Sequence, residues 1–149
     1  METSDSRPAA YERAKMDDKP SLPHDGVTRP YHDLIGLRVT SMDNGRATVV
    51  LDKTTELHNA FGGIHGGAIA SLIDVACAMS IRSAQPEIRG SATISLSISF
   101  LDTSAGHLTA VGTVTRLGNT IASTEAKVTD ETGKLVAQAI GSFRVIRKK

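Results

Sequence analysis

A single carboxylate, Asp74, lies in the otherwise apolar stretch from Ile64 to Ile81. Its helical neighbours three and four positions away are small or apolar: Ala70, Ser71, Cys77 and Ala78. No Lys or Arg pairs with Asp74 along a helix. A buried, unpaired carboxylate costs several kcal/mol, so its partners must come from elsewhere or the group must serve chemistry. Two interpretations stay open: a functional carboxylate in a cleft, where its small neighbours leave room for a ligand, or an acid on an exposed strip or capping a loop.

Four glycines lie at the start of this stretch and just before it, in Gly62-Gly63-Ile64-His65-Gly66-Gly67. A helix that begins near Gly66 leaves backbone N–H groups unpaired at the positive end of its dipole. Such groups polarise a carbonyl or hold an oxyanion. A phosphate-binding loop is disfavoured because its Lys-Ser/Thr ending is missing. Alternatively, the glycines only let the helix enter the sheet.

Other chemistries have weaker signals. His58 and His65 could bind a metal with Asp74, yet they lie seven residues apart across glycines rather than on one helical face. No Gly-x-Ser-x-Gly motif occurs, and Cys77 lies on the apolar helical face, where a thiolate is disfavoured. We expect the remaining histidines to be solvated: His24, His32 and His107.

The elements that position these residues follow from periodicity. Apolar and small residues recur at helical spacing before Pro86: Ile69, Leu72, Ile73, Ala76, Cys77 and Ser80. This helix is apolar on nearly every side, which predicts burial. A short helical turn at 31–35 closed by Gly36 is also expected. Alternation and turn residues predict strands at 37–42, 46–51, 91–101, 106–117, 120–129 and 135–146. The sequence therefore predicts an α+β fold, an antiparallel sheet wrapped around one long central helix.

Composition bounds the function. The chain has 149 residues, one domain's length, and a formal charge of +1, unlike a nucleic-acid binder. One cysteine and no apolar signal segment favour the cytoplasm. The segment 64–81 is as long as a short membrane span, but its Asp74, His65 and two glycines favour a buried helix instead. We expect residues 1–29 to be a disordered tail and 30–149 to be the domain. An unpaired edge of the long, Ser- and Thr-rich strand at 91–101 favours a dimer.

The spacing Asn59, His65-Gly66-Gly67 and Asp74 resembles the hotdog-fold acyl-CoA thioesterases, in the phenylacetate-pathway (PaaI-like) branch of the 4-hydroxybenzoyl-CoA thioesterase superfamily. In that family a His-Gly-Gly follows the Asn by six residues, and the acid follows the His by nine. The resemblance covers roughly residues 31–144 and includes the strand that ends in Ser-Ile-Ser-Phe-Leu101.

This resemblance implies a site across a dimer interface, with Asn59 and His-Gly-Gly of one subunit facing Asp74 of the other. Asp74 would be general base or nucleophile, and the Gly66 amide would polarise the thioester carbonyl. His65 would hold the loop and carbonyl, and Asn59 would orient water or the carboxylate. The implied substrate-binding residues are Gly67, Thr93, Phe61 and Met79.

The predicted function is hydrolysis of acyl-CoA or aryl-CoA thioesters by a homodimer or dimer of dimers. We expect no metal or redox cofactor, no nucleic-acid or membrane partner, and coenzyme A only as part of the substrate. The alternative is a hotdog module that binds acyl-CoA without catalysis. A hotdog hydratase is disfavoured. Members of that family carry an Asp followed five residues later by a His on the helix, and position 79 here is Met.

Overall fold

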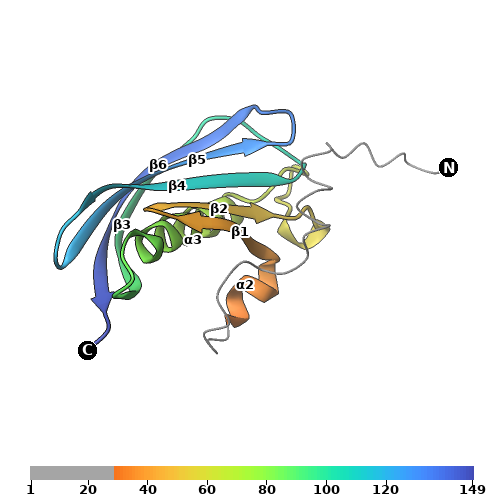
Figure 1. Cartoon of the computed structure of the whole chain (residues 1–149). Helices are drawn as coiled ribbons and strands as arrows, with labels where there is room; N and C mark the ends of the chain where they lie inside the picture. Colours follow the sequence, from red (N-terminus) through yellow and green to blue (C-terminus); the bar gives the residue numbers. More distant parts are fainter. Residues whose placement is uncertain (1–28) are drawn as a thin grey trace.

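The computed structural model describes residues 29–149, and the predicted tail falls outside this range except for Arg29. A six-stranded antiparallel sheet runs in the order β1-β2-β4-β5-β6-β3. Its strands are β1 (Leu37–Asp43), β2 (Arg46–Leu51), β3 (Ile88–Phe100), β4 (Leu108–Leu117), β5 (Ile121–Asp130) and β6 (Leu135–Arg147). The sheet curls over one long helix, α3 (Gly66–Ala84), as Figure 1 shows. The predicted α+β fold is confirmed.

Local turn chemistry sets the connections. Asn44 and Gly45 both have positive φ, 46° and 79°, as a two-residue hairpin between β1 and β2 requires. The predicted short helix is α2 (Pro30–Ile35), which ends at Gly36 in the left-handed conformation. The predicted loop at 52–63 contains a 3-10 turn, η1 (Thr55–Leu57). Pro86 follows the end of α3, as predicted.

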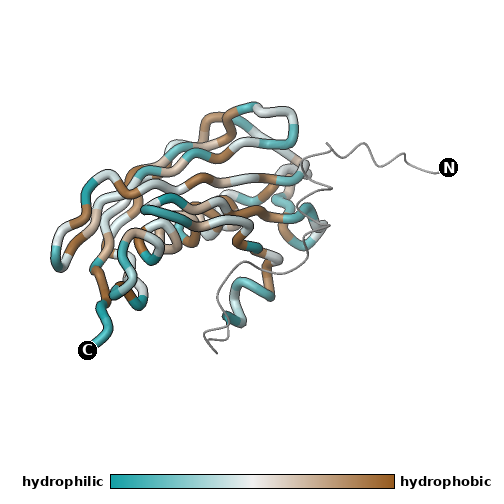
Figure 2. The backbone as a smooth tube through the Cα atoms, in the orientation of Figure 1, coloured by the Kyte–Doolittle hydropathy of each residue, from teal (hydrophilic) through white to brown (hydrophobic). Residues whose placement is uncertain are grey.

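The core lies between α3 and the concave face of the sheet. All six residues of the predicted apolar helical face are buried: Ile69, Leu72, Ile73, Ala76, Cys77 and Ser80. β4 approaches α3 so closely that a Cβ at Gly112 would collide with the Ala76 carbonyl. α3 is long and apolar enough to cross a membrane by length and composition, but 56% of that window is buried inside the fold. Figure 2 shows hydrophobic and hydrophilic segments alternating along the strands around it.

β3 matches the predicted half-buried strand only in part. Leu96 and Ile98 pack against the core, as the alternation predicts. Within residues 29–149 β3 is an edge strand paired only to β6, and its register shifts between Thr93 and Ser95. The apolar side chains of Ile94 and Phe100 are 57% and 54% exposed. Alternation reports two faces of a strand but not whether a second layer covers either face, so the sequence could not reveal this exposure.

Candidate active site

The loop ahead of α3 is shaped by Asn59. Its side-chain oxygen Oδ1 accepts hydrogen bonds from the backbone N–H groups of Phe61 (2.9 Å) and Gly63 (3.2 Å). Its own N–H donates to the Gly63 carbonyl at 2.7 Å. Within residues 29–149 the amide nitrogen Nδ2 has no hydrogen-bond partner. Asn59 therefore builds the loop with its oxygen and keeps a donor for another molecule.

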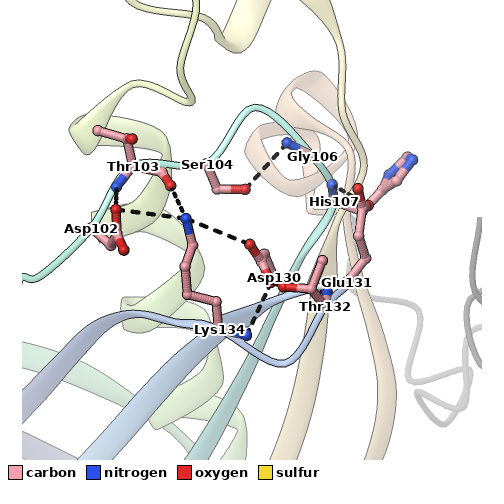
Figure 3. A network of polar contacts seen from close by, with 9 residues as sticks. All are labelled: Asp102, Thr103, Ser104, Gly106, His107, Asp130, Glu131, Thr132 and Lys134. Atoms are coloured by element: carbon pink, nitrogen blue, oxygen red, sulfur yellow. Dashed lines mark hydrogen bonds and ion pairs between the residues drawn. The ribbon is translucent and has the colours of Figure 1, made fainter.

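Backbone hydrogen bonds to neighbouring segments anchor the glycine loop ahead of α3. The Ile64 N–H donates to the Ser104 carbonyl at 2.7 Å, and the His65 N–H donates to the Leu57 carbonyl at 2.7 Å. Ser104 lies in the β3–β4 connection, which Lys134 ties to the β5–β6 turn (Figure 3). The Lys134 ammonium donates to the Thr103 carbonyl at 2.7 Å. The glycine loop is thus anchored on two sides before α3 begins.

His65 caps the start of α3. Its Nδ1 accepts a hydrogen bond from the Gly67 N–H at 2.8 Å, so a neutral His65 carries its proton on Nε2. The Gly67 amide is therefore occupied. The Gly66 N–H has no partner among residues 29–149 and lies at the positive end of the α3 dipole. Gly66 is the free donor of this turn, and the Phe100 ring lies beside it.

Asp74 lies in the middle of α3 and is partly buried. The Thr93 hydroxyl, on β3, donates a hydrogen bond of 2.6 Å to Asp74 Oδ1. Hydrogen bonds to an ionised carboxylate are short and strong, so Thr93 fixes the orientation of this group. Its partner comes from elsewhere in the chain, one of the two conditions inferred from the sequence for tolerating a partly buried acid.

The two halves of the predicted site lie at different points along α3. Asp74 lies eight residues after Gly66, which separates their backbones by about 12 Å along the axis of α3 at 1.5 Å per residue. A carboxylate that activates water lies within hydrogen-bond reach of it, at about 3 Å. This separation favours a site in which the two groups come from different chains.

The two residues predicted to wall the acyl group lie in different settings. Phe61, at the tip of the glycine loop, is 96% exposed. Met79 is partly buried on α3, where it packs against the core. Their role in substrate binding stays a prediction.

The described residues test two of the weaker predictions, a reactive Cys77 thiol and a metal site. Burial raises the pKa of the Cys77 thiol to about 11, with a smaller contribution from Asp74 and an opposing hydrogen bond from Thr124. Cys77 is thus a buried thiol, as expected from its face of the helix. Between residues 29 and 149, no group of three or more His, Cys, Asp or Glu side chains gathers as a metal site requires. The metal interpretation of His58 and His65 finds no support there.

The prediction that His32 and His107 are solvated is wrong. His107 Nδ1 accepts a hydrogen bond from the Lys53 N–H at 3.0 Å. His32, on α2, is half-buried. No periodicity links α2 to the rest of the fold, so the sequence carried no signal for this burial; His24 lies outside the described residues.

Comparisons with known proteins identify the family of this chain. A family model described as the thioesterase superfamily matches residues 61–137. A protein of Saccharolobus solfataricus named as an esterase is 34% identical over 119 residues, 77% of this chain and 82% of that protein. The 1,4-dihydroxy-2-naphthoyl-CoA hydrolase of Listeria monocytogenes is 29% identical over 121 residues, covering 78% of this chain and 96% of the hydrolase.

Among solved structures, the PaaI protein of the E. coli phenylacetic acid degradation operon superposes with a TM-score of 0.72. The two are 25% identical, and the match covers 91% of this chain and 90% of PaaI. The fold is the hotdog fold, so the resemblance drawn from the sequence is confirmed. The chain belongs to the thioesterase superfamily.

Proposed function

We propose that this protein hydrolyses acyl-CoA or aryl-CoA thioesters as a homodimer, or as a dimer of dimers, with each site built from two chains. Asp74 of one protomer acts on a carbonyl held at Gly66 of the other. The observation that carries the proposal is the separation of about 12 Å between these two groups along α3. Each chain thus offers two half-sites, and a two-fold dimer pairs them reciprocally.

The exposed edge of β3 is the surface that supports this dimer. β3 is 13 residues long and, among the residues that the structure describes, pairs only with β6, so its other edge has no strand beside it there and offers pairing to a strand of another chain. Apolar side chains on it and just after it are half-exposed: Ile94, Phe100 and Leu101. Thr93 of this strand donates a hydrogen bond to Asp74, and the Phe100 ring at its end lies beside Gly66. A partner that pairs along β3 therefore comes close to both half-sites.

The chemistry follows from the groups present. In the general-base route, Asp74 takes a proton from water, and the oxygen bonds to the thioester carbon. The developing oxyanion is stabilised by the Gly66 N–H and the α3 dipole. The C–S bond then breaks, and the thiolate of coenzyme A receives the proton from Asp74. In the nucleophilic route, the carboxylate attacks the same carbon, the C–S bond breaks, and the thiolate of coenzyme A leaves behind a mixed anhydride with Asp74. Water then cleaves the anhydride, which releases the free acid, restores the Asp74 carboxylate and supplies the proton that the thiolate takes up.

The other residues have supporting roles in this proposal. Asn59 offers its Nδ2 donor to the water or the carboxylate, and His65 holds the loop and the carbonyl. Phe61 and Met79 wall the acyl group, and Gly67 gives the substrate close backbone approach. Neither route needs a metal or redox cofactor. The CoA thioester class is supported by the Listeria relative, whose name states a CoA hydrolase, and we expect activity in the cytoplasm.

Release of free thiol from a panel of acyl-CoA and aryl-CoA thioesters tests the proposal and reads acyl preference at once. Asp74→Asn keeps the shape and the Thr93 contact but cannot accept a proton. We expect turnover to fall by about 10² or more while the fold and the oligomer stay intact. Asp33→Asn, on the exposed surface of α2, is the matched control.

Parental turnover in Asp74→Asn would contradict the mechanism. Saturable binding of acyl-CoA by the parent protein without any thiol release would instead support the non-catalytic binding module. Circular dichroism and sedimentation of both variants establish that folding and assembly are unchanged.

A further inference from the structure

The short helix α2 is joined to α3 by a side-chain hydrogen bond one turn before Asp74. The Tyr31 hydroxyl lies 2.8 Å from Ser71 Oγ. Ser71 Oγ donates its one proton to the Gly67 carbonyl at 2.9 Å, so Tyr31 is the donor in the first bond. Ser71 precedes Asp74 by three residues, so their side chains are neighbours on one face of α3. The Tyr31 hydroxyl therefore lies about one helical turn from the proposed catalytic acid.

The face that carries Asp74 is the less buried side of α3. Its residues are only partly buried, and those beside the acid are small: Ala70, Ser71 and Ala78. Small side chains leave room for a ligand along the helix on either side of the carboxylate. Tyr31 is bonded to this face on the side of Asp74 that leads back to the start of α3, so its ring limits the room in that direction.

The ring of Tyr31 presents an apolar surface to a ligand. Tyr31 is 54% exposed, and no residue of α2 is buried. Because the hydroxyl donates its proton to Ser71, it has none left for a ligand, and the ring is what remains open. The ring suits the apolar acyl group of a thioester, whereas the pantetheine arm of coenzyme A carries amides that need hydrogen-bond partners.

We infer that Tyr31 is a specificity-determining residue that forms one wall of the acyl site beside Asp74 of the same chain and limits the length of the acyl group. This inference rests on the proposed function, because the acyl group extends from the carbon on which Asp74 acts. Ser71 lies about 4.5 Å from Asp74 along the axis of α3, so a butyryl or benzoyl group reaches Tyr31. A long alkyl chain must displace the ring and break its bond to Ser71.

The first test measures binding without turnover. S-butyl-CoA and S-dodecyl-CoA have no carbonyl and bind without being hydrolysed, and calorimetry gives their Kd values. We expect the parent to favour the butyl ligand, and Tyr31→Ala to shift the ratio of the two Kd values toward the dodecyl ligand by about tenfold or more. Leu34→Ala, on the same helix and 80% exposed, keeps the parental ratio. An unchanged ratio in a folded Tyr31→Ala overturns the inference.

The second test does not depend on the folding of Tyr31→Ala. The sequence has two tyrosines, Tyr11 and Tyr31, so the ring signals of Tyr31 in NMR spectra are assigned by their loss in Tyr31→Phe. We expect saturating S-benzyl-CoA to shift these signals in the parent protein, because the two rings pack together, and coenzyme A alone to leave them in place. Tyr31 signals that do not move with S-benzyl-CoA overturn the inference.

Thiol release separates this inference from the proposed function. If thioesters are hydrolysed while Tyr31→Ala keeps the parental Kd ratio, the proposed function stands and the inference about Tyr31 fails. If the ratio shifts but no acyl-CoA releases thiol, the proposed hydrolysis fails, and Tyr31 selects the ligand of a binding module. If the parent binds neither thioether, both fail.

Discussion

The two edges of the sheet differ in length and cover. β1 is 7 residues long, its Leu37 and Val39 are buried, and α2 leads directly into it. β3 is 13 residues long and carries Ile94, which is 57% exposed. Short, covered edges resist pairing with another chain, and long, open ones favour it. This difference is the reason for proposing that β3 faces a partner, and β3 is also the strand whose Thr93 donates a hydrogen bond to Asp74.

The largest expected effect comes from charging the open edge. Ile94→Glu places like charges opposite one another in a dimer paired along β3, so we expect dissociation to monomers and loss of turnover by more than about 10². Sedimentation velocity and thiol release measure the two results. The same change at the β1 edge, Ser41→Glu, leaves assembly and turnover as in the parent. A fully active Ile94→Glu dimer would remove β3 from the interface.

A smaller effect is expected from the bond between β3 and the acid. Thr93→Val deletes the hydroxyl that donates to Asp74 and preserves the shape of the side chain. A hydrogen bond to a charged group contributes about 1.5–3 kcal/mol, which corresponds to a loss of about tenfold to a hundredfold in kcat. The control is Ser95→Ala, on the same strand, whose hydroxyl bonds to Ser142 instead. Equal kcat values for the two variants would show that Thr93 does not orient the acid.

The smallest effect is expected on the labelling of Cys77, which distinguishes dissociation of the dimer from unfolding of the chain. Because the pKa of Cys77 is about 11, only about one thiol in a thousand is ionised at pH 8 in the folded chain. We expect a thiol reagent at pH 8 to label Cys77 slowly in the parent and equally slowly in monomeric Ile94→Glu, and rapidly in guanidinium. Rapid labelling of native Ile94→Glu would mean that opening β3 also opens the core around α3.

The sequence predicted the parts of the molecule that depend on local pattern. The helical period predicted α3, and the Asn44-Gly45 pair predicted the turn between β1 and β2. Gly36 predicted the end of the short helix α2. Exposure of β3 could not be predicted, because alternation along a strand is the same whether its face meets a core, solvent or a second chain.

Some features of the candidate site could be predicted from the sequence and others could not. Asp74 and Gly66 were predicted from residue type and spacing, and Thr93 from the resemblance to the family. The role predicted for Asn59, to orient the water or the carboxylate, stays a prediction; its oxygen shapes the loop, and its nitrogen is open within the described residues. The bond between Tyr31 and Ser71 was missed because it depends on how α2 packs against α3, which no sequence period encodes.

Complementation between two inactive variants tests the central claim most directly. Asn59→Ala and Asp74→Asn are unfolded together, refolded at equal concentrations and assayed for thiol release, with heterodimers verified by mass. If each site takes its loop from one chain and its acid from the other, half of the dimers are mixed and each holds one intact site, so roughly a quarter of the parental activity returns. If each site lies within one chain, verified heterodimers stay as inactive as either variant alone.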